Sequence, residues 1–111
     1  MIKLQASREY RYVLKAEKGK ADATEFTLKT LTPEDMLRIE DESFDYDVQQ
    51  GKSKVRIGSS VLKRVEIGVI GWNLKEECTI ENKRKLPVEV IKELSSELVE
   101  TSYIKDEEVK N

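Results

Sequence analysis

Residues 61–74, VLKRVEIGVIGWNL, carry the only tryptophan of the chain, Trp72, behind an apolar run that includes two of the five glycines. Strand periodicity puts alternate apolar residues on one side of this stretch, namely Val65, Ile67 and Val69. Helical periodicity instead forms two apolar stripes, one of Val61, Val65, Gly68 and Trp72 and the other of Ile67, Ile70, Gly71 and Leu74. Glycine costs about 1 kcal/mol in a helix, so a helix here requires close packing at both glycines. The pattern leaves helix and strand open over residues 64–70.

Trp72 itself has two interpretations. It closes the core where Leu74 and the last helix converge, because large aromatic side chains are mostly buried. Alternatively, Gly68 and Gly71 open a shallow groove beside Trp72, and an apolar helix of a partner docks there on an aromatic anchor. The candidate partner-binding residues are therefore Gly68, Gly71, Trp72 and Leu74.

Upstream, residues 9–17 (EYRYVLKAE) and 24–31 (TEFTLKTL) alternate apolar with polar side chains, which is typical of strands. The connection between them, KGKADA, is short and polar and contains Gly19, so we expect an N-terminal β-hairpin. Residues 52–57 (KSKVRI) also alternate, and Ser53–Ile57 is a candidate for a third short strand.

Two segments carry helix signals. In LTPEDMLRIEDE, Thr32 can cap, Pro33 suits the first helical position and Asp35 stands where a capping box places its acid, so we expect a helix from Pro33 to about Asp41. Residues 86–100 (LPVEVIKELSSELVE) predict an amphipathic helix. Its apolar face consists of Ile91, Leu94, Ser95, Leu98 and Ser102, widened by Val90 and Val99. Between Leu74 and this helix we expect a polar connection.

These segments predict one α+β domain over residues 1–101, with an N-terminal hairpin, a candidate third strand and three helices. Residues 102–111 form a charged tail that we expect to fray or to order only against a partner. The 111 residues are 38% apolar and 38% charged, against about 45–50% and about 25% in typical domains. The core should therefore be thin and the surface heavily charged.

Charge is segregated in the middle of the chain. Seven acids and one base lie between Glu34 and Asp47, and five bases and no acid lie between Lys52 and Arg64. Such charges are either solvated or paired within the fold, where they contribute little, or they pair head to tail between copies. The candidate electrostatic interface consists of Asp41, Asp45, Asp47, Lys52, Lys54 and Arg56.

Most site chemistry is missing from the sequence. There is no histidine, only one cysteine, and no glycine-rich phosphate-binding motif. An enzyme that uses carboxylates to hold a metal would need Asp41, Asp45 and Asp47 to converge. We therefore expect no catalytic or metal-binding residue, no cofactor, no small-molecule substrate and no enzymatic activity.

Nucleic acid and membranes are disfavoured as partners. The net charge of −2 and the pI of about 5.4 argue against a broad phosphate-binding surface. The alternative of a small nucleic-acid-binding or regulatory module would use the local bases Lys52, Lys54, Arg56, Lys63, Arg64 and Lys83 to Lys85. The longest apolar stretch is too short to span a membrane and the N-terminus lacks a signal-peptide core, so we expect a cytoplasmic protein.

The order of these segments resembles a group of small proteins from tailed bacteriophages and prophages, the tail assembly chaperone-like proteins. Three stretches carry the resemblance: EFTLKTLTPEDMLRIEDES, VLKRVEIGVIGWNL and LPVEVIKELSSELVETSYIKDEEVKN. It implies a protein of the host cytoplasm that helps tail tube and tape measure proteins to assemble, or else a small virion component. Self-association is the alternative that the segregated charges suggest. The resemblance also favours a helix over residues 60–72.

Overall fold

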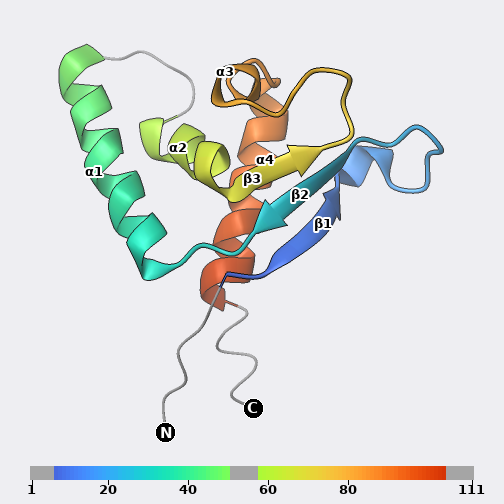
Figure 1. Ribbon diagram of the computed structural model, residues 1–111, viewed down its shortest axis with the longest axis horizontal. Coiled ribbons are helices and arrows are strands. Elements are labelled where there is room, and N and C mark those ends of the chain that lie inside the picture. Colours follow the sequence, from blue (N-terminus) through green and yellow to red (C-terminus); the bar gives the residue numbers. More distant parts are fainter. Residues whose placement is uncertain (1–6, 51–57, 105–111) are drawn as a thin grey trace, which may run out of the picture.

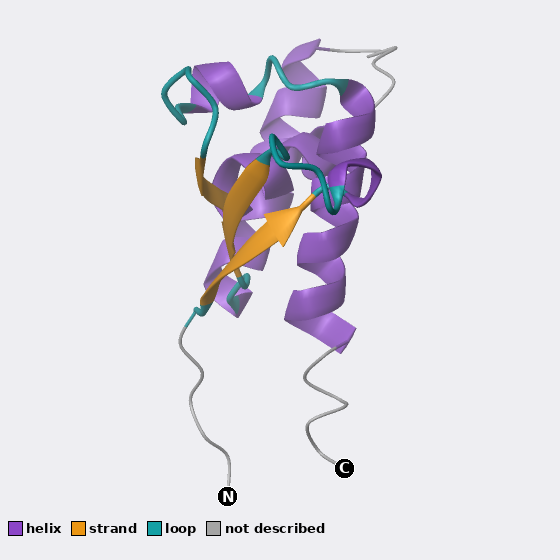
Figure 2. Cartoon of the chain, turned by 90° about the vertical axis from the view of Figure 1, so that its right-hand side faces the viewer, coloured by secondary structure: helices purple, strands orange, loops and turns teal. Residues whose placement is uncertain are grey.

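The computed structural model of the chain describes residues 7–50 and 58–104, and the side chains of residues 7–42 and 58–102. These residues form an α+β fold in which three antiparallel strands, in the order β1-β2-β3, pack against helices (Figure 1). Figure 2 shows the strands lying in front of the long helices. The fold class predicted from the sequence is confirmed.

The N-terminal hairpin is present. Strand β1 (Glu9–Val13) pairs antiparallel with β2 (Glu25–Lys29), and Tyr12 lies opposite Phe26. The connection contains a short 3-10 helix, η1 (Lys15–Glu17), and then turns at Gly19, whose φ of +85° is a backbone conformation that glycine adopts without steric cost. The alternating pattern of the two strands therefore predicted their pairing correctly.

The stretch that the sequence left ambiguous is both helix and strand. Helix α2 (Ser59–Gly68) runs directly into strand β3 (Val69–Trp72), which pairs with β2 and places Trp72 opposite Phe26. The helix expected over residues 60–72 is thus correct only as far as Gly68. The β-branched pair after Gly68 favours a strand, and an edge of the sheet is available to receive it. The candidate strand Ser53–Ile57 lies outside the described residues.

Helix α1 (Pro33–Gln50) begins where predicted and continues nine residues past the predicted end at Asp41. Its start is a capping box, because the Asp35 N–H donates to Thr32 Oγ1 (3.2 Å) and the Thr32 N–H donates to Asp35 Oδ2 (3.1 Å). The helix continues because the chain after Asp41 contains no glycine or proline before Gly51 that would end it.

The C-terminal half adds three helical segments. Helix α3 (Ile80–Lys83) is a single turn inside the segment expected to be a polar connection, and Thr79 Oγ1 caps it by accepting from the Asn82 N–H. Helix α4 (Val88–Val99) confirms the predicted amphipathic helix and is followed by a π-helical turn, η2 (Glu100–Ile104). Ser102 is buried one residue past the predicted end of the domain, and its Oγ accepts from the Leu31 N–H at 2.8 Å.

The core lies between one face of the sheet and the helices behind it. Phe26 and Leu28 of β2, together with Val69 of β3, are almost completely buried. Their main partners come from α2 and α4, namely Val65, Ile91, Leu94 and Leu98. Leu14, Leu31 and Ile39 complete this cluster of ten buried apolar residues. The small cluster agrees with the low apolar content of the sequence.

Two tyrosines of β1 join the sheet to the C-terminal helices. The Tyr12 hydroxyl donates to Glu93 Oε2 of α4 at 2.5 Å, and the Tyr10 hydroxyl lies 2.8 Å from Thr101 Oγ1 of η2. Burial raises the pKa of Tyr10 to about 12. Burial, followed by the hydrogen bond to Glu93, also raises the pKa of Tyr12 well above its usual value of about 10.

We expect the free energy of unfolding to fall steeply as the pH rises above about 10. Both tyrosines then ionise in the unfolded chain while the folded protein keeps their protons, so the unfolded state binds fewer protons and is favoured. For Tyr10 this loss extends from about pH 10 to about pH 12. Urea unfolding of the wild type and of a Tyr10→Phe/Tyr12→Phe double variant at several pH values checks this. Equal slopes against pH in the two proteins would contradict it.

Candidate partner-binding surface and charge network

Trp72 packs on the core and also faces the loop that follows β3. Its ring meets the ring of Phe26 edge to face, with centroids 6.2 Å apart and an interplanar angle of 79°. Its indole N–H donates to the backbone oxygen of Glu76 at 2.7 Å. Trp72 is half-buried, so its ring contributes to the core and leaves part of its surface at the exterior.

The two glycines do not form one groove with Trp72. A Cβ placed on Gly68 would lie 2.5 Å from Leu98 Cδ1, so the space beside Gly68 is filled by α4. A Cβ on Gly71 would lie 3.5 Å from Thr27 Cβ, which is ordinary contact with the neighbouring strand. Gly68 is thus the position at which α2 packs closely against α4, where a larger side chain would not fit. It lines no open surface.

Exposed apolar side chains gather in the segment from Ile70 to Ile80. Four large apolar residues in the described part of the chain are exposed: Ile70 (40%), Leu74 (36%), Ile80 (48%) and, on α1, Leu37 (60%). Three of these four lie within eleven consecutive residues that span β3, the following loop and the start of α3. We call Ile70, Trp72, Leu74 and Ile80 the β3–α3 surface.

Ile70 and Ile80 were not among the residues singled out from the sequence. Alternation after buried Val69 places Ile70 on the outer side of the strand, and the register shift between β2 and β3 then returns Trp72 to the side of Phe26. Ile80 is the one large apolar residue in the polar segment KEECTIENKRK apart from Cys78. An isolated apolar residue among charged neighbours is a sequence pattern that would have indicated its exposure.

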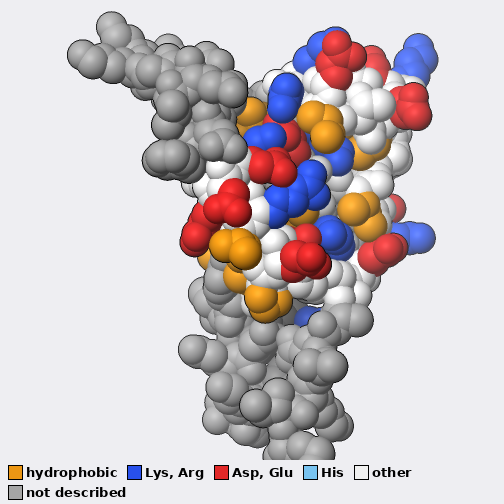
Figure 3. Space-filling view, turned by 60° about the vertical axis from the view of Figure 1, so that its left-hand side comes forward, with side chains coloured by type: hydrophobic (Ala, Val, Ile, Leu, Met, Phe, Trp, Pro, Cys, Tyr) orange, Lys and Arg blue, Asp and Glu red, His pale blue; other side chains and the backbone are white. Residues whose placement is uncertain are grey.

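A chain of alternating charges links α1, α2 and α3. From α1, Arg38 Nε contacts Glu42 Oε2 at 2.8 Å, and Glu42 Oε1 lies 3.2 Å from Lys63 Nζ of α2. Lys63 also contacts Glu66 Oε1 (3.4 Å), and Glu66 Oε2 accepts from Arg84 Nε at 2.7 Å. Figure 3 shows acidic and basic side chains intermixed over the described part of this face. The charges of the α1 and α2 segments are thus partly neutralised inside one molecule.

Only part of the proposed electrostatic interface is described. Asp41 is exposed on α1, whereas the side chains of Asp45 and Asp47 and the whole of Lys52, Lys54 and Arg56 lie outside the described residues. The Glu42–Lys63 contact joins the acidic segment to the basic one within the chain. That contact is an example of internal pairing, one of the two alternatives for these segments.

The described bases proposed for nucleic-acid binding are largely engaged by the protein itself. Lys63 and Arg84 contact Glu66, and buried Lys83 donates from Nζ to the backbone oxygen of Glu66 at 2.9 Å. Arg64 donates from Nη1 to Ser95 Oγ at 2.6 Å, and its buried Nε has no hydrogen-bond partner among the described residues. A phosphate surface at these positions would require several of these contacts to break.

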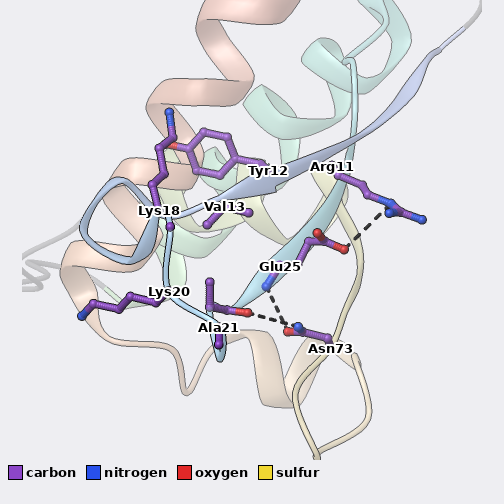
Figure 4. Close-up of a pocket in the computed structure, with 10 residues that line it drawn as sticks. Arg11, Tyr12, Val13, Lys18, Lys20, Ala21, Glu25 and Asn73 are labelled. Atoms are coloured by element: carbon purple, nitrogen blue, oxygen red, sulfur yellow. Dashed lines mark hydrogen bonds and ion pairs between the residues drawn. The ribbon is translucent and has the colours of Figure 1, made fainter.

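A shallow pocket lies on the outer side of the hairpin, with a volume of about 580 Å³. Val13, Ala21 and Ala23 contribute apolar surface and three bases lie at its edge: Arg11, Lys18 and Lys20. Figure 4 shows Arg11 and Lys20 pointing to opposite sides, and Arg11 is paired with Glu25 at 3.8 Å. The cationic groups do not converge on one point, so the pocket lacks the geometry of an anion site.

No group of three or more possible metal-ligating side chains occurs among the described residues. Cys78 is a free thiol, partly buried against the core, and burial raises its pKa, which disfavours the reactive thiolate. None of the helices in the described ranges has the length and apolar character needed to cross a membrane.

Comparisons of the chain with protein-family models, with curated proteins and with solved structures found no match.

Proposed function

We propose that this chain is a non-enzymatic assembly protein that acts through protein–protein contacts at the β3–α3 surface, in the manner of a tail assembly chaperone or a small virion component of a tailed bacteriophage. The observation that carries the proposal is the gathering of Ile70, Leu74 and Ile80 in one exposed segment beside Trp72. Exposed apolar residues together with an aromatic residue are the usual composition of the centre of a protein interface.

The phage assignment rests on the sequence resemblance. Its partners are then tail tube or tape measure proteins, or a second copy of the chain, and its place is the cytoplasm of the host cell or the virion. Neither a cofactor nor a catalytic residue has a role in this proposal. A nucleic-acid-binding function is not supported by the described bases, because Lys63, Lys83 and Arg84 already form ion pairs or hydrogen bonds with Glu66.

Co-purification tests this function. The tagged protein is co-expressed with the tail tube or tape measure protein of the same genome, and we expect one of them to be recovered. Ile70→Lys and Ile80→Lys should each lower the recovery about tenfold or more, because a charge is placed in the apolar centre of the contact. Leu37→Lys, which changes an equally apolar and more exposed residue on α1, is the matched control and should leave recovery unchanged.

Light scattering after size exclusion distinguishes the two kinds of partner. The protein alone is run over a range of concentrations at low and at high salt. An oligomer that grows with concentration and is lost in Ile70→Lys identifies a second copy as the partner, and a monomer at every concentration directs attention to the tail proteins. If neither tail protein is recovered and no oligomer forms, the proposed function is wrong. Equal recovery with Ile80→Lys, Ile70→Lys and Leu37→Lys would place the contact elsewhere.

A further inference from the structure

The segment from Asn73 to Leu86 joins β3 to α4 and forms an arch that returns from the end of β3 towards α2 (Figure 1). It contains a single turn of helix, α3, whose large apolar residue Ile80 points outward and contributes little to the core. Apolar packing of the arch onto the body comes from Cys78 and Leu86, which lie partly buried against the core. The arch therefore depends on polar contacts more than the rest of the fold does.

At its start the arch is held by Asn73, which forms hydrogen bonds with Ala23 and Glu25. The polar contacts of its C-terminal part converge on one residue of α2, Glu66. Its carboxylate accepts from Arg84 Nε at 2.7 Å, and its backbone oxygen accepts from Lys83 Nζ at 2.9 Å. The Glu66 side chain is 3% exposed, whereas that of Arg84 is 52% exposed. Lys63 Nζ lies 3.4 Å from the Glu66 carboxylate and belongs to α2 itself. If the contact with Arg84 breaks, the buried carboxylate is therefore still paired with Lys63, and the cost of an unpaired buried charge does not arise.

The other end of the arch rests on Trp72. The indole N–H donates to the backbone oxygen of Glu76, which lies four residues further along the arch. Opening of the arch would free this N–H, uncover more of the Trp72 ring and expose the Cys78 thiol. The ring of Trp72 would remain on Phe26, since their contact is made between β2 and β3.

We propose that residues 73–86 form a strap clamped on Glu66, and that release of this clamp controls access to Trp72. The inference rests on the proposed function in one respect, namely that the partner of the β3–α3 surface contacts the exposed ring of Trp72. Lys83 is buried in the closed strap, and this burial lowers the pKa of its ammonium group.

The rate at which a disulfide reagent such as 5,5′-dithiobis(2-nitrobenzoate) labels Cys78 measures opening without any partner. We expect Arg84→Gln to raise this rate roughly five- to tenfold over the wild type, after each is divided by the rate for the same protein in denaturant. Lys85→Gln, which removes the adjacent exposed charge, is the matched control and should label like the wild type. High salt should speed labelling of the wild type more than that of Arg84→Gln.

Dependence on denaturant separates opening of the strap from unfolding of the whole protein. A local opening exposes little surface, so its labelling rate should change little at low urea concentrations, and quenching of Trp72 fluorescence by acrylamide should rise in parallel. Equal labelling of Arg84→Gln, Lys85→Gln and the wild type would overturn the inference, as would labelling that tracks global unfolding alone. Failure to recover a partner protein would instead count against the proposed function and leave the labelling result standing.

Discussion

Gly68→Val destabilises the protein by about 3 kcal/mol, in the upper range expected for forcing extra atoms into a packed core. Even the first added atom would lie 2.5 Å from Leu98 Cδ1, 2.7 Å from Cδ2 and 3.1 Å from Cγ. Leu98 is completely buried, so its side chain can move aside only if its packed neighbours also shift. The cost opposes the gain of about 1 kcal/mol or less that replacing glycine brings to a helix. Urea unfolding followed by circular dichroism measures the difference.

Gly71→Val is the matched control, three residues away. Its Cβ would lie 3.5 Å from Thr27 Cβ, and a β-branched residue suits a strand, so we expect a change within about 1 kcal/mol in either direction. A Gly68→Ala/Leu98→Ala double variant should be less unstable than the sum of the two single variants, because the smaller residue at position 98 removes the clash. Similar losses at Gly68 and Gly71 would show that packing against α4 is not what requires glycine at position 68.

Phe26→Ala should cost about 3–5 kcal/mol, a large share of the stability expected for a domain of this size. Phe26 is 1% exposed and lies at the centre of the sheet, opposite Tyr12 on one side and Trp72 on the other. Its removal also takes away the edge-to-face partner of Trp72. The measurement is urea unfolding followed by Trp72 fluorescence, whose emission should shift to the red as water enters beside the ring.

Phe26→Leu separates volume from aromatic contact. It retains most of the buried apolar surface, so we expect a loss of about 1.5 kcal/mol, together with the loss of the ring contact. If Phe26→Ala proved as stable as Phe26→Leu, the strand pair would not be the centre of the core, and the arrangement of β2 between β1 and β3 would need revision.

The features that the sequence predicted correctly depend on interactions between near neighbours. The hairpin followed from alternation in two short segments, the start of α1 from the capping residues Thr32 and Asp35, and α4 from apolar residues at helical spacing. Each of these patterns has a local physical cause in backbone conformation, hydrogen bonding of a helix end, or the period of a helix. These features can therefore be predicted without knowledge of the rest of the chain.

The features that were missed depend on contacts between distant residues. Helix α2 ends at Gly68, where it packs against Leu98 of α4. The chain continues from Val69 as strand β3 because β2 has a free edge with which it can pair. The length of α1 was underestimated, because its acidic second half gave no local signal of continuation. The helical turn α3 was missed because its residue Lys83 is held by Glu66, seventeen residues earlier in the chain.

The amino-acid sequence by itself determined the α+β class, the hairpin, the start of α1, helix α4 and a surface rich in charge. Only the tertiary structure decided that residues 61–74 divide into helix and strand at Gly68 and that Trp72 lies on Phe26. It also decided that Lys63 of α2 and Arg84, which follows α3, meet the carboxylate of Glu66. The physical reason is that periodicity and capping act within a few residues, whereas burial, edge pairing and neutralisation of charge require surfaces that exist only after the chain has folded.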